Sequence, residues 1–318
     1  MRSIDNFAFV KGTEVRNILY YGLLPHLNMF MNVEQYSHLA LYVCAMRLLH
    51  SGHIFNDRTS EIAHQLFAEF YKDHELFDKD KQSLKLHLHA HFETLYEAHG
   101  SLCNLGCFGQ ESFIGFVSSK HHGTSHYGDS ITHSYNIDFA IQNKKEEKTT
   151  INGAYDIVST LLASDNNHLK DFHDFICTCD NLNSCFKIYR RFMINNKMFH
   201  SIIYTKKRDS VSYFVQYLLN DDIDERRFGV IDLFFTYNGN GYALIKYYRV
   251  KELFSNAFKN SYYYYLLTRP IDRSYYIVEK TYCQYDIVLT GQILNHCVVI
   301  DKTDYLFVTN ILSYGEHD

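Results

Sequence analysis

The sequence predicts an α+β protein, with an N-terminal all-helical domain followed by a small antiparallel β-barrel. In the first half, apolar residues recur at the three- and four-residue spacing of amphipathic helices. From Phe186 onward, the spacing changes to short alternating stretches separated by turn signals. The chain has 318 residues, of which 46% are hydrophobic, and this composition excludes general disorder. The aromatic residues, 16% of the total and all Tyr or Phe, suit strands and packed faces.

The expected helices are bounded by residues that cap or break them. Pro25 is expected to end the first helix, Asp57 or Thr59 can cap the third, and Gly100 follows the fourth. In chain order, helices are expected over residues 14–24, 32–49, 59–70, 84–98, 110–121 and 130–143, with weaker helices over 155–163 and 168–177.

The expected strands are short and joined by tight turns. Asn195–Asn196–Lys197 is typical of a hairpin, and Asn238–Gly239–Asn240–Gly241 is the strongest turn signal, because Asn-Gly tolerates positive φ angles. Strands are expected over residues 187–194, 198–204, 210–218, 230–237, 242–250, 262–267, 275–279, 297–301 and 305–311. Such a series is typical of a small barrel or a sandwich.

Charge and the run of polar residues at 143–149 divide the chain. We expect a helical domain over 1–143, a helical connector over 144–184 and the barrel over 185–318. The first 184 residues carry 14 Lys/Arg against 22 Asp/Glu, and the rest carry 17 against 14. Neither part is basic enough to indicate nucleic-acid binding by charge alone, so two domains with ordinary surfaces also fit.

The sequence shows no signal peptide at its start and no run of 18 apolar residues. We therefore expect an intracellular protein with no membrane partner. Its eight cysteines are expected to be reduced in that compartment.

Histidines and cysteines suggest a metal site in the helical half. His87 and His91 are four residues apart, so a helix would present both imidazoles on one face. Cys103 and Cys107 follow at a similar spacing, and the four residues together can form a Zn²⁺ site. The alternative is that these four are unrelated core or surface residues.

Glu111 lies near the start of the helix expected over 110–121. A carboxylate in a first helical turn is stabilised by the helix dipole and needs no further role.

Three segments resemble the helical region that follows the catalytic core in DDE transposases of the CACTA/En-Spm type. They are KGTEVRNILYYGL at 11–23, LKLHLHAHFETLYEAHGSL at 84–102 and FGQESFIGFVSSKHHG at 108–123. The likeness covers about the first 140 residues. The matching positions are Glu14, Leu19, Tyr21, Gly22, His87, His91, Gly100, Leu102, Glu111, Ser112, Phe113, Gly115, His122, Gly123 and Thr124.

The resemblance implies roles for three of these residues. It assigns Glu111 as the third carboxylate of a DDE active site, whose other two are aspartates on an RNase H-like sheet. Three such carboxylates hold two Mg²⁺ ions that activate the attacking oxygen and stabilise the leaving one. It also gives His87 and His91 a zinc-binding role.

This sequence departs from that pattern, because no strand precedes Glu111 and both aspartates are missing. One carboxylate cannot hold two metal ions, so Mg²⁺ is expected only together with a complete DDE core. The resemblance thus implies a nuclear, catalytically incomplete C-terminal fragment of a transposase that binds DNA or protein, or acts as a scaffold. Alternatively, Glu111 completes an active site in trans with a catalytic-core polypeptide.

The strands after Phe228 resemble the central hairpin of a bromo-adjacent-homology (BAH) or SH3-like barrel. Tyr237, Tyr242, Tyr247 and Tyr248 on that barrel can bind a peptide or stack on bases, or they can fill its core. The binding alternative implies a chromatin or protein-interaction module.

Overall fold

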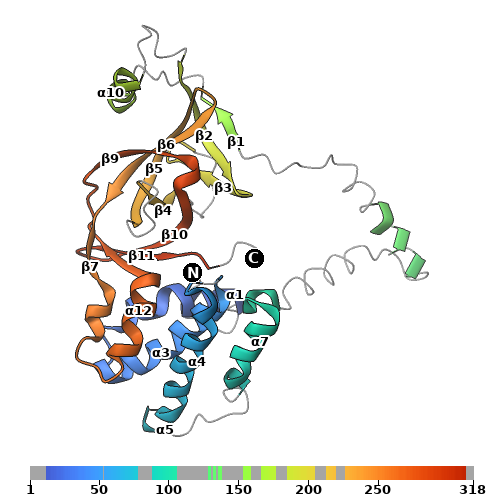
Figure 1. Ribbon diagram of the computed structural model, residues 1–318, viewed down its shortest axis with the longest axis vertical. Coiled ribbons are helices and arrows are strands. Elements are labelled where there is room, and N and C mark those ends of the chain that lie inside the picture. The colour runs from blue at the N-terminus through green and yellow to red at the C-terminus, as the bar shows by residue number, and fades with distance from the viewer. Residues whose placement is uncertain are drawn as a thin grey trace, which may run out of the picture.

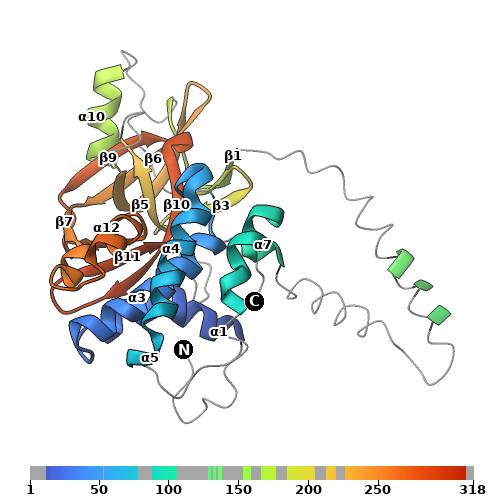
Figure 2. The same ribbon diagram turned by 60° about the horizontal axis from the view of Figure 1, so that its bottom comes forward.

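The computed structural model shows a helical layer packed on one part of a large antiparallel sheet, with one further helix at the far end of that sheet (Figures 1 and 2). It describes residues 12–52, 54–77, 88–105, 128–129, 132–133, 135–137, 153–158, 166–176, 185–204, 213–219 and 226–312.

Most of the described helices belong to the N-terminal part. The α-helices are α1 (Gly12–Asn17), α2 (Leu23–Leu27), α3 (Val33–His50), α4 (Thr59–Lys72), α5 (His74–Phe77), α7 (Phe92–His99), α10 (Asn167–Ile176) and α12 (Tyr264–Ser274). A π-helical segment, η2 (Ile18–Gly22), joins α1 to α2. The 3₁₀ turns are η3 (Asn56–Arg58), η4 (His89–His91), η5 (Leu102–Leu105), η7 (Phe254–Phe258) and η8 (Thr290–Gln292).

Eleven antiparallel strands form one sheet. They are β1 (Gly153–Ile157), β2 (Lys187–Ile194), β3 (Lys197–His200), β4 (Phe214–Leu218), β5 (Arg226–Tyr237), β6 (Asn240–Tyr248), β7 (Val250–Leu253), β8 (Tyr275–Val278), β9 (Gln284–Leu289), β10 (Ile293–Asp301) and β11 (Leu306–Asn310). The order is β1-β2-β5-β4-β10-β11-β8-β7, with β3 paired to β2, β6 paired to β5, and β9 paired to β6.

The N-terminal helices share one hydrophobic core with the sheet, so the expectation of a separate all-helical domain was wrong. Buried residues of α3 and α4 pack with residues of η7, α12, β8 and β11 in a single cluster. The ring of Tyr36 on α3 stacks on Phe258 with centroids 4.8 Å apart, and Ser261 donates a hydrogen bond to Glu34 at 2.9 Å. These contacts join residues more than 200 positions apart, which periodicity along the chain does not reveal.

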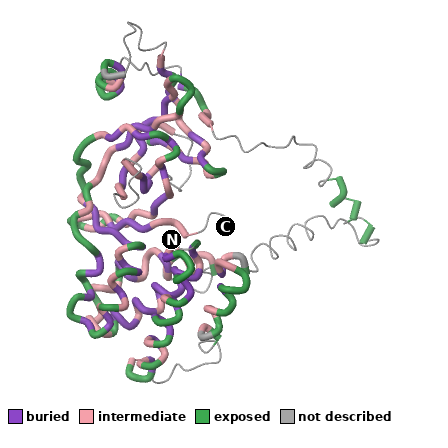
Figure 3. The backbone as a smooth tube through the Cα atoms, in the orientation of Figure 1, coloured by how far each residue is buried: buried purple, intermediate pink, exposed green. Residues whose placement is uncertain are grey.

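The β part is larger than the expected small SH3- or BAH-like barrel, and that expectation was also wrong. The sheet runs on through β10 and β11 to β8 and β7, which carry the helical layer. Its other part curves around a buried cluster that includes Phe192, Phe199, Tyr217 and Ile245. Figure 3 shows the buried positions concentrated in this curved part and in the adjoining helices. Helix α10 covers the outer face of the curved part through Leu169 and Phe172.

The two expected hairpin turns are present. Asn195 and Asn196 have φ angles of 48° and 62°, and Asn238 and Gly239 have φ angles of 48° and 80°. Two successive positive φ angles match the right-handed twist of the flanking strands, which is why Asn and Gly occupy these positions.

Two segments have the opposite secondary structure from the one expected. Residues 262–267 were expected to form a strand, but the segment enters α12, and Tyr263, Leu267 and Ile271 are buried at four-residue intervals. The weak helix expected over 155–163 is replaced at its start by β1, which pairs with β2. In both segments a contact distant in sequence determines the structure, rather than the local pattern.

Candidate functional site

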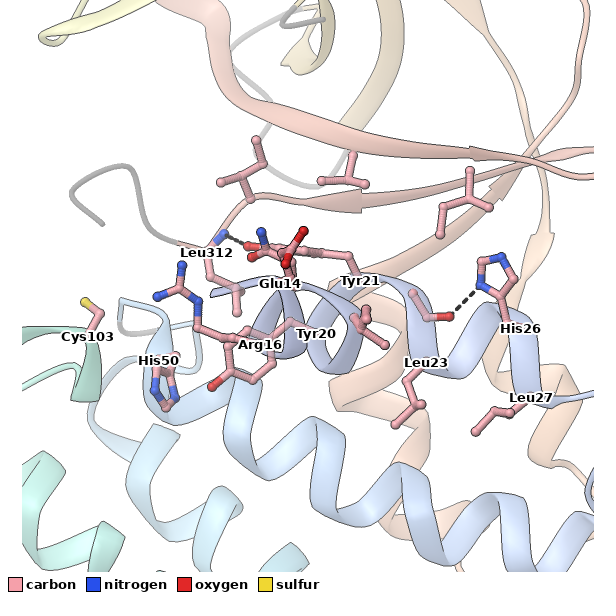
Figure 4. A pocket seen from close by; sticks show the side chains of 16 residues that line it. Glu14, Arg16, Tyr20, Tyr21, Leu23, His26, Leu27, His50, Cys103 and Leu312 are labelled. Atoms are coloured by element: carbon pink, nitrogen blue, oxygen red, sulfur yellow. Dashed lines mark hydrogen bonds between the residues drawn. The ribbon is translucent and has the colours of Figure 1, made fainter. Parts of the chain in front are cut away.

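A pocket of about 860 Å³ lies between the N-terminal helical segments and strand β10, and we call it the helix–sheet pocket (Figure 4). One wall is formed by α1, η2 and α2, which contribute Ile18, Tyr21 and Leu27 among others. The facing wall is formed by Val298 and Ile300 of β10. Pockets of this size and mainly apolar lining are typical of small-molecule sites.

The π-helical segment shapes the first wall. The backbone N–H of Leu23 donates to the carbonyl of Ile18, five residues earlier, so one extra residue is inserted relative to an α-helix. Pro25, expected to end the helix, instead lies inside α2. Proline has no N–H and its ring crowds the preceding turn, and the wider π turn accommodates both effects.

Buried Arg47 of α3 fastens this segment to the sheet. Its Nη1 donates to the carbonyl of Tyr20, and its Nη2 donates to the carbonyl of Asn310 at 3.2 Å. The guanidinium lies 4.6 Å from the ring centroid of Tyr275, whose hydroxyl donates to the same Tyr20 carbonyl at 2.9 Å. Arg47 therefore holds the pocket wall and the end of β11 in a fixed relation.

The polar groups in the middle of the pocket already have partners. Leu312 N–H donates to the hydroxyl of Tyr21 at 3.1 Å, and His26 Nδ1 donates to the carbonyl of Gly22 at 2.7 Å (Figure 4). A ligand in the middle of the helix–sheet pocket would therefore contact mainly apolar side chains.

The end of the pocket near α3 is polar. Arg16, His50 and Cys103 lie there, with Glu14 on the same helix as Arg16. His50 Nδ1 donates to the carbonyl of Met46 at 3.0 Å, which leaves Nε2 as an acceptor. Burial lowers the pKa of His50, the hydrogen bond to Met46 opposes this shift, and the charge of the nearby Arg16 guanidinium adds to it.

A second candidate site is the hairpin formed by β2 and β3, which we call the basic hairpin. It carries Lys187, Arg190, Arg191, Lys197 and His200. Residues 185–208 contain seven Lys/Arg and no Asp or Glu. This local run is missed when charge is summed over half of the chain, and a short sliding window would have found it.

Arg191 and His200 are directly opposite in the β2–β3 ladder, so their side chains share one face. Tyr204 lies beside both, with its ring centroid 4.7 Å from that of His200 and 5.0 Å from the Arg191 guanidinium. Asp156 of β1 pairs with Arg191.

Lys197 lies on the opposite face of the hairpin, next to buried His296 of β10. The imidazole of His296 stacks on Phe199 with centroids 4.0 Å apart. Burial, then the charges of His200 and Lys197, lower the pKa of His296 to about 4. The Lys197 amine therefore lies beside a buried imidazole for which burial disfavours the charged form.

Three residues of the sequence-based sites, His87, Cys107 and Glu111, lie outside the described residues. His91 is exposed on η4, and Cys103 lines the helix–sheet pocket, where its Sγ lies 2.9 Å from Ser101 Oγ. No group of three or more His, Cys, Asp or Glu side chains suited to a metal ion occurs in the described part of the chain. The four-residue zinc site stays a prediction.

The histidine with the clearest contacts in this region is His89, which the sequence did not single out. Its Nδ1 lies 3.0 Å from the Tyr71 hydroxyl, and its ring is 4.8 Å from that of Phe92. His89 is thus part of the aromatic packing between α4 and α7.

The four tyrosines proposed for a binding surface are distributed over three clusters. Tyr237 and Tyr242 belong to the cluster beneath α10. Tyr247 lies 4.8 Å from the guanidinium of Arg227, and Tyr248 packs in a different cluster, near Phe214. The structure does not bring the four together, and a binding role for any of them stays a prediction.

Comparisons of the chain with protein-family models, curated proteins and solved structures find no match. Within the described ranges, no helix is both long enough and apolar enough to cross a membrane.

Proposed function

We propose that this chain is a DNA-binding piece of a transposase-like protein and that the basic hairpin contacts the phosphate backbone. The observation that carries the proposal is the run of seven Lys/Arg without a carboxylate over residues 185–208. Because the resemblance is to DNA transposases, we expect the polyanion that contacts this hairpin to be DNA. Because β2 also pairs with β1 and β5, the hairpin is part of the sheet, and the expected contact is with the phosphate backbone rather than by insertion into a groove.

The electrostatics of the hairpin support this proposal. Lys187 is exposed, Lys197 is partly buried, and burial lowers the pKa of Lys197. A phosphate next to Lys197 would favour the charged form of its amine, which burial disfavours. Tyr204 beside Arg191 and His200 provides a ring on which a base or sugar can pack.

The test is fluorescence anisotropy of the full chain with labelled duplex DNA over a series of salt concentrations. Each phosphate contact that is removed lowers the slope of log affinity against log salt by about 1. We expect Lys187→Gln and Lys197→Gln each to do so. Lys259→Gln is the matched control, because Lys259 is an exposed lysine of the helical layer.

Equal salt slopes for the hairpin variants and the Lys259 control would refute the proposal. Binding of single-stranded RNA with no binding of duplex DNA would refute it as well. Near-UV circular dichroism of each variant separates a lost contact from a lost fold.

We also propose that the chain alone does not cut DNA. The resemblance assigns it one active-site carboxylate, Glu111, whereas two Mg²⁺ ions require several. Plasmid nicking with Mg²⁺ or Mn²⁺ tests this, and we expect none. Nicking that disappears in Glu111→Ala would contradict it.

A further inference from the structure

We propose that the helix–sheet pocket binds a single-chain amphiphile with an acidic head group, such as a fatty acid. The hydrocarbon chain would lie along η2 and α2 against β10, and the carboxylate would lie beside Arg16. This site is separate from the basic hairpin and does not depend on the proposed function.

The shape of the pocket indicates an elongated ligand. Its lining follows the helical segments from Arg16 to Leu27, which at 1.5 Å per residue corresponds to about 16 Å. His26 marks one end, and Arg16, His50 and Cys103 mark the other (Figure 4). A compact ligand would leave much of this length unfilled.

The chemistry of the middle indicates hydrocarbon rather than peptide. A peptide backbone needs a hydrogen-bond partner for each buried polar group, or its burial costs free energy. The hydroxyl of Tyr21 and the carbonyls of Tyr20 and Gly22 already accept hydrogen bonds from within the protein. Facing them, Val298 and Ile300 present aliphatic side chains, which suit methylene groups.

The polar end indicates an anionic head group. Arg16 lines this end of the pocket, and its guanidinium brings a positive charge there. A carboxylate beside Arg16 gains charge-assisted hydrogen bonds, which are stronger than those between neutral groups. The carboxylate of Glu14 lies at the same end and repels an anionic head group. Removing the charge of Glu14 should therefore increase the affinity for the ligand.

The binding test uses the full chain and cis-parinaric acid, a fluorescent fatty acid, displaced by laurate or by dodecanol. We expect laurate to bind more tightly than dodecanol. Arg16→Gln should weaken laurate binding about tenfold and leave dodecanol binding unchanged. Glu14→Gln should tighten laurate binding about threefold. Arg58→Gln, an exposed arginine on α4's N-terminal side, is the matched control and should change neither ligand.

Two further measurements locate the ligand. Ile311→Trp adds an indole to the pocket lining and should weaken both laurate and dodecanol more than tenfold. Laurate should also protect Cys103 from alkylation, measured by site-resolved mass spectrometry, while exposed Cys283 outside the pocket reacts at an unchanged rate.

Each of the following results would overturn the proposal. They are equal affinity of the wild-type chain for laurate and dodecanol, an unchanged rate of Cys103 alkylation with laurate present, and tight laurate binding by a folded Ile311→Trp variant. Vesicles of phosphatidylglycerol distinguish a free acid from a membrane lipid. Sedimentation of the chain with these vesicles, without laurate binding, would also overturn it.

Discussion

The helix–sheet core contains a buried arginine, Arg47, and the curved sheet contains Arg227, whose side chain is 16% exposed; different partners stabilise the two charges. In the helix–sheet core, Arg47 is 1% exposed and lies against backbone carbonyls and the ring of Tyr275. In the curved sheet, Arg227 donates to the carboxylate of Asp286 at 3.0 Å. Asp286 also accepts from the Tyr217 hydroxyl at 2.7 Å.

The difference shows what each arginine contributes. The carbonyls that accept from Arg47 belong to Tyr20 and Asn310, on two separate segments, so this arginine joins distant parts of the chain. Arg227 and Asp286 are on β5 and β9, both neighbours of β6, and satisfy each other within one sheet. Removing Arg47 should loosen the pocket wall, whereas removing the charge of Asp286 should leave Arg227 without its ion-pair partner.

The largest expected effect is that of Asp286→Asn. The amide keeps the shape of the side chain but removes the charge that compensates Arg227, and unpairing a buried ion costs about 3 to 5 kcal/mol. Urea unfolding measures this loss. Asp301→Asn is the control, because Asp301 pairs with Lys280 at the surface, where the two side chains are 71% and 38% exposed. We expect a loss below about 1 kcal/mol there. Equal losses for the two variants would contradict the distinction.

Arg47→Met should follow, with a loss of about 3 kcal/mol. The thioether fills most of the space, but two carbonyls lose charge-assisted hydrogen bonds worth about 1.5 to 3 kcal/mol each, offset by removal of a buried charge. The same urea titration applies, with exposed Arg58→Met as the control.

In addition, Cys103 should be alkylated faster in Arg47→Met, because the pocket wall is no longer held to the sheet. An unchanged rate of Cys103 alkylation would show that Arg47 stabilises the core without positioning the pocket.

The next prediction concerns pH and the interior of the sheet. His296 has a pKa of about 4 in the folded chain and near 6.5 when unfolded. Between these values only the unfolded state takes up the proton, so stability falls as the pH falls from about 6.5 towards 4. From pH 7 to pH 5 this group accounts for about 2 kcal/mol. In His296→Leu the difference in unfolding free energy between pH 7 and pH 5 should shrink by that amount. The same pH dependence in both proteins would exclude His296 as its source.

The smallest expected effect is that of Gly229→Ala on β5. An added Cβ would contact the side chain of Ile245 and lie 2.6 Å from the carbonyl oxygen of Lys246, so strand β6 would have to move. We expect a loss of about 1 to 2 kcal/mol from overpacking, reduced by the better strand propensity of alanine. Gly291→Ala, where nothing lies within 4 Å, should be close to neutral. A neutral Gly229→Ala would show that β5 and β6 separate easily.

The local sequence pattern correctly predicted the helices and hairpins in which apolar and turn residues recur at regular intervals. The helices from Val33 and Thr59, and the hairpins at Asn195 and Asn238, are where the spacing and turn residues placed them. Strands β7 and β9 were not predicted, because β7 is mostly exposed and β9 has an aspartate, Asp286, at a buried position. Residues 262–267 were misassigned because a run of tyrosines favours strand by propensity. The packing of α12 on α3 overrides that preference.

The helix–sheet pocket could be predicted only in part. Glu14, Tyr21 and Gly22 were noted in the resemblance, but their partners on β10 lie about 280 residues later. Arg47 has a recognisable signal, because it lies among apolar residues of a helix that is buried around most of its circumference, with Val43 four and Ala40 seven residues earlier. A positively charged side chain at such a position predicts a buried hydrogen-bond partner, but only the tertiary structure shows which group that partner is.

The π turn of η2 also determines which way α1 faces. Each residue of an α-helix turns the chain by about 100°. If the same residues formed an uninterrupted α-helix, the extra residue would rotate α1 by about one such step, and Arg16 would turn away from the pocket that it lines. The wider π turn takes up that step. Deleting one residue between Ile18 and Gly22 should therefore remove the π turn and leave Arg16 on the same side of the helix.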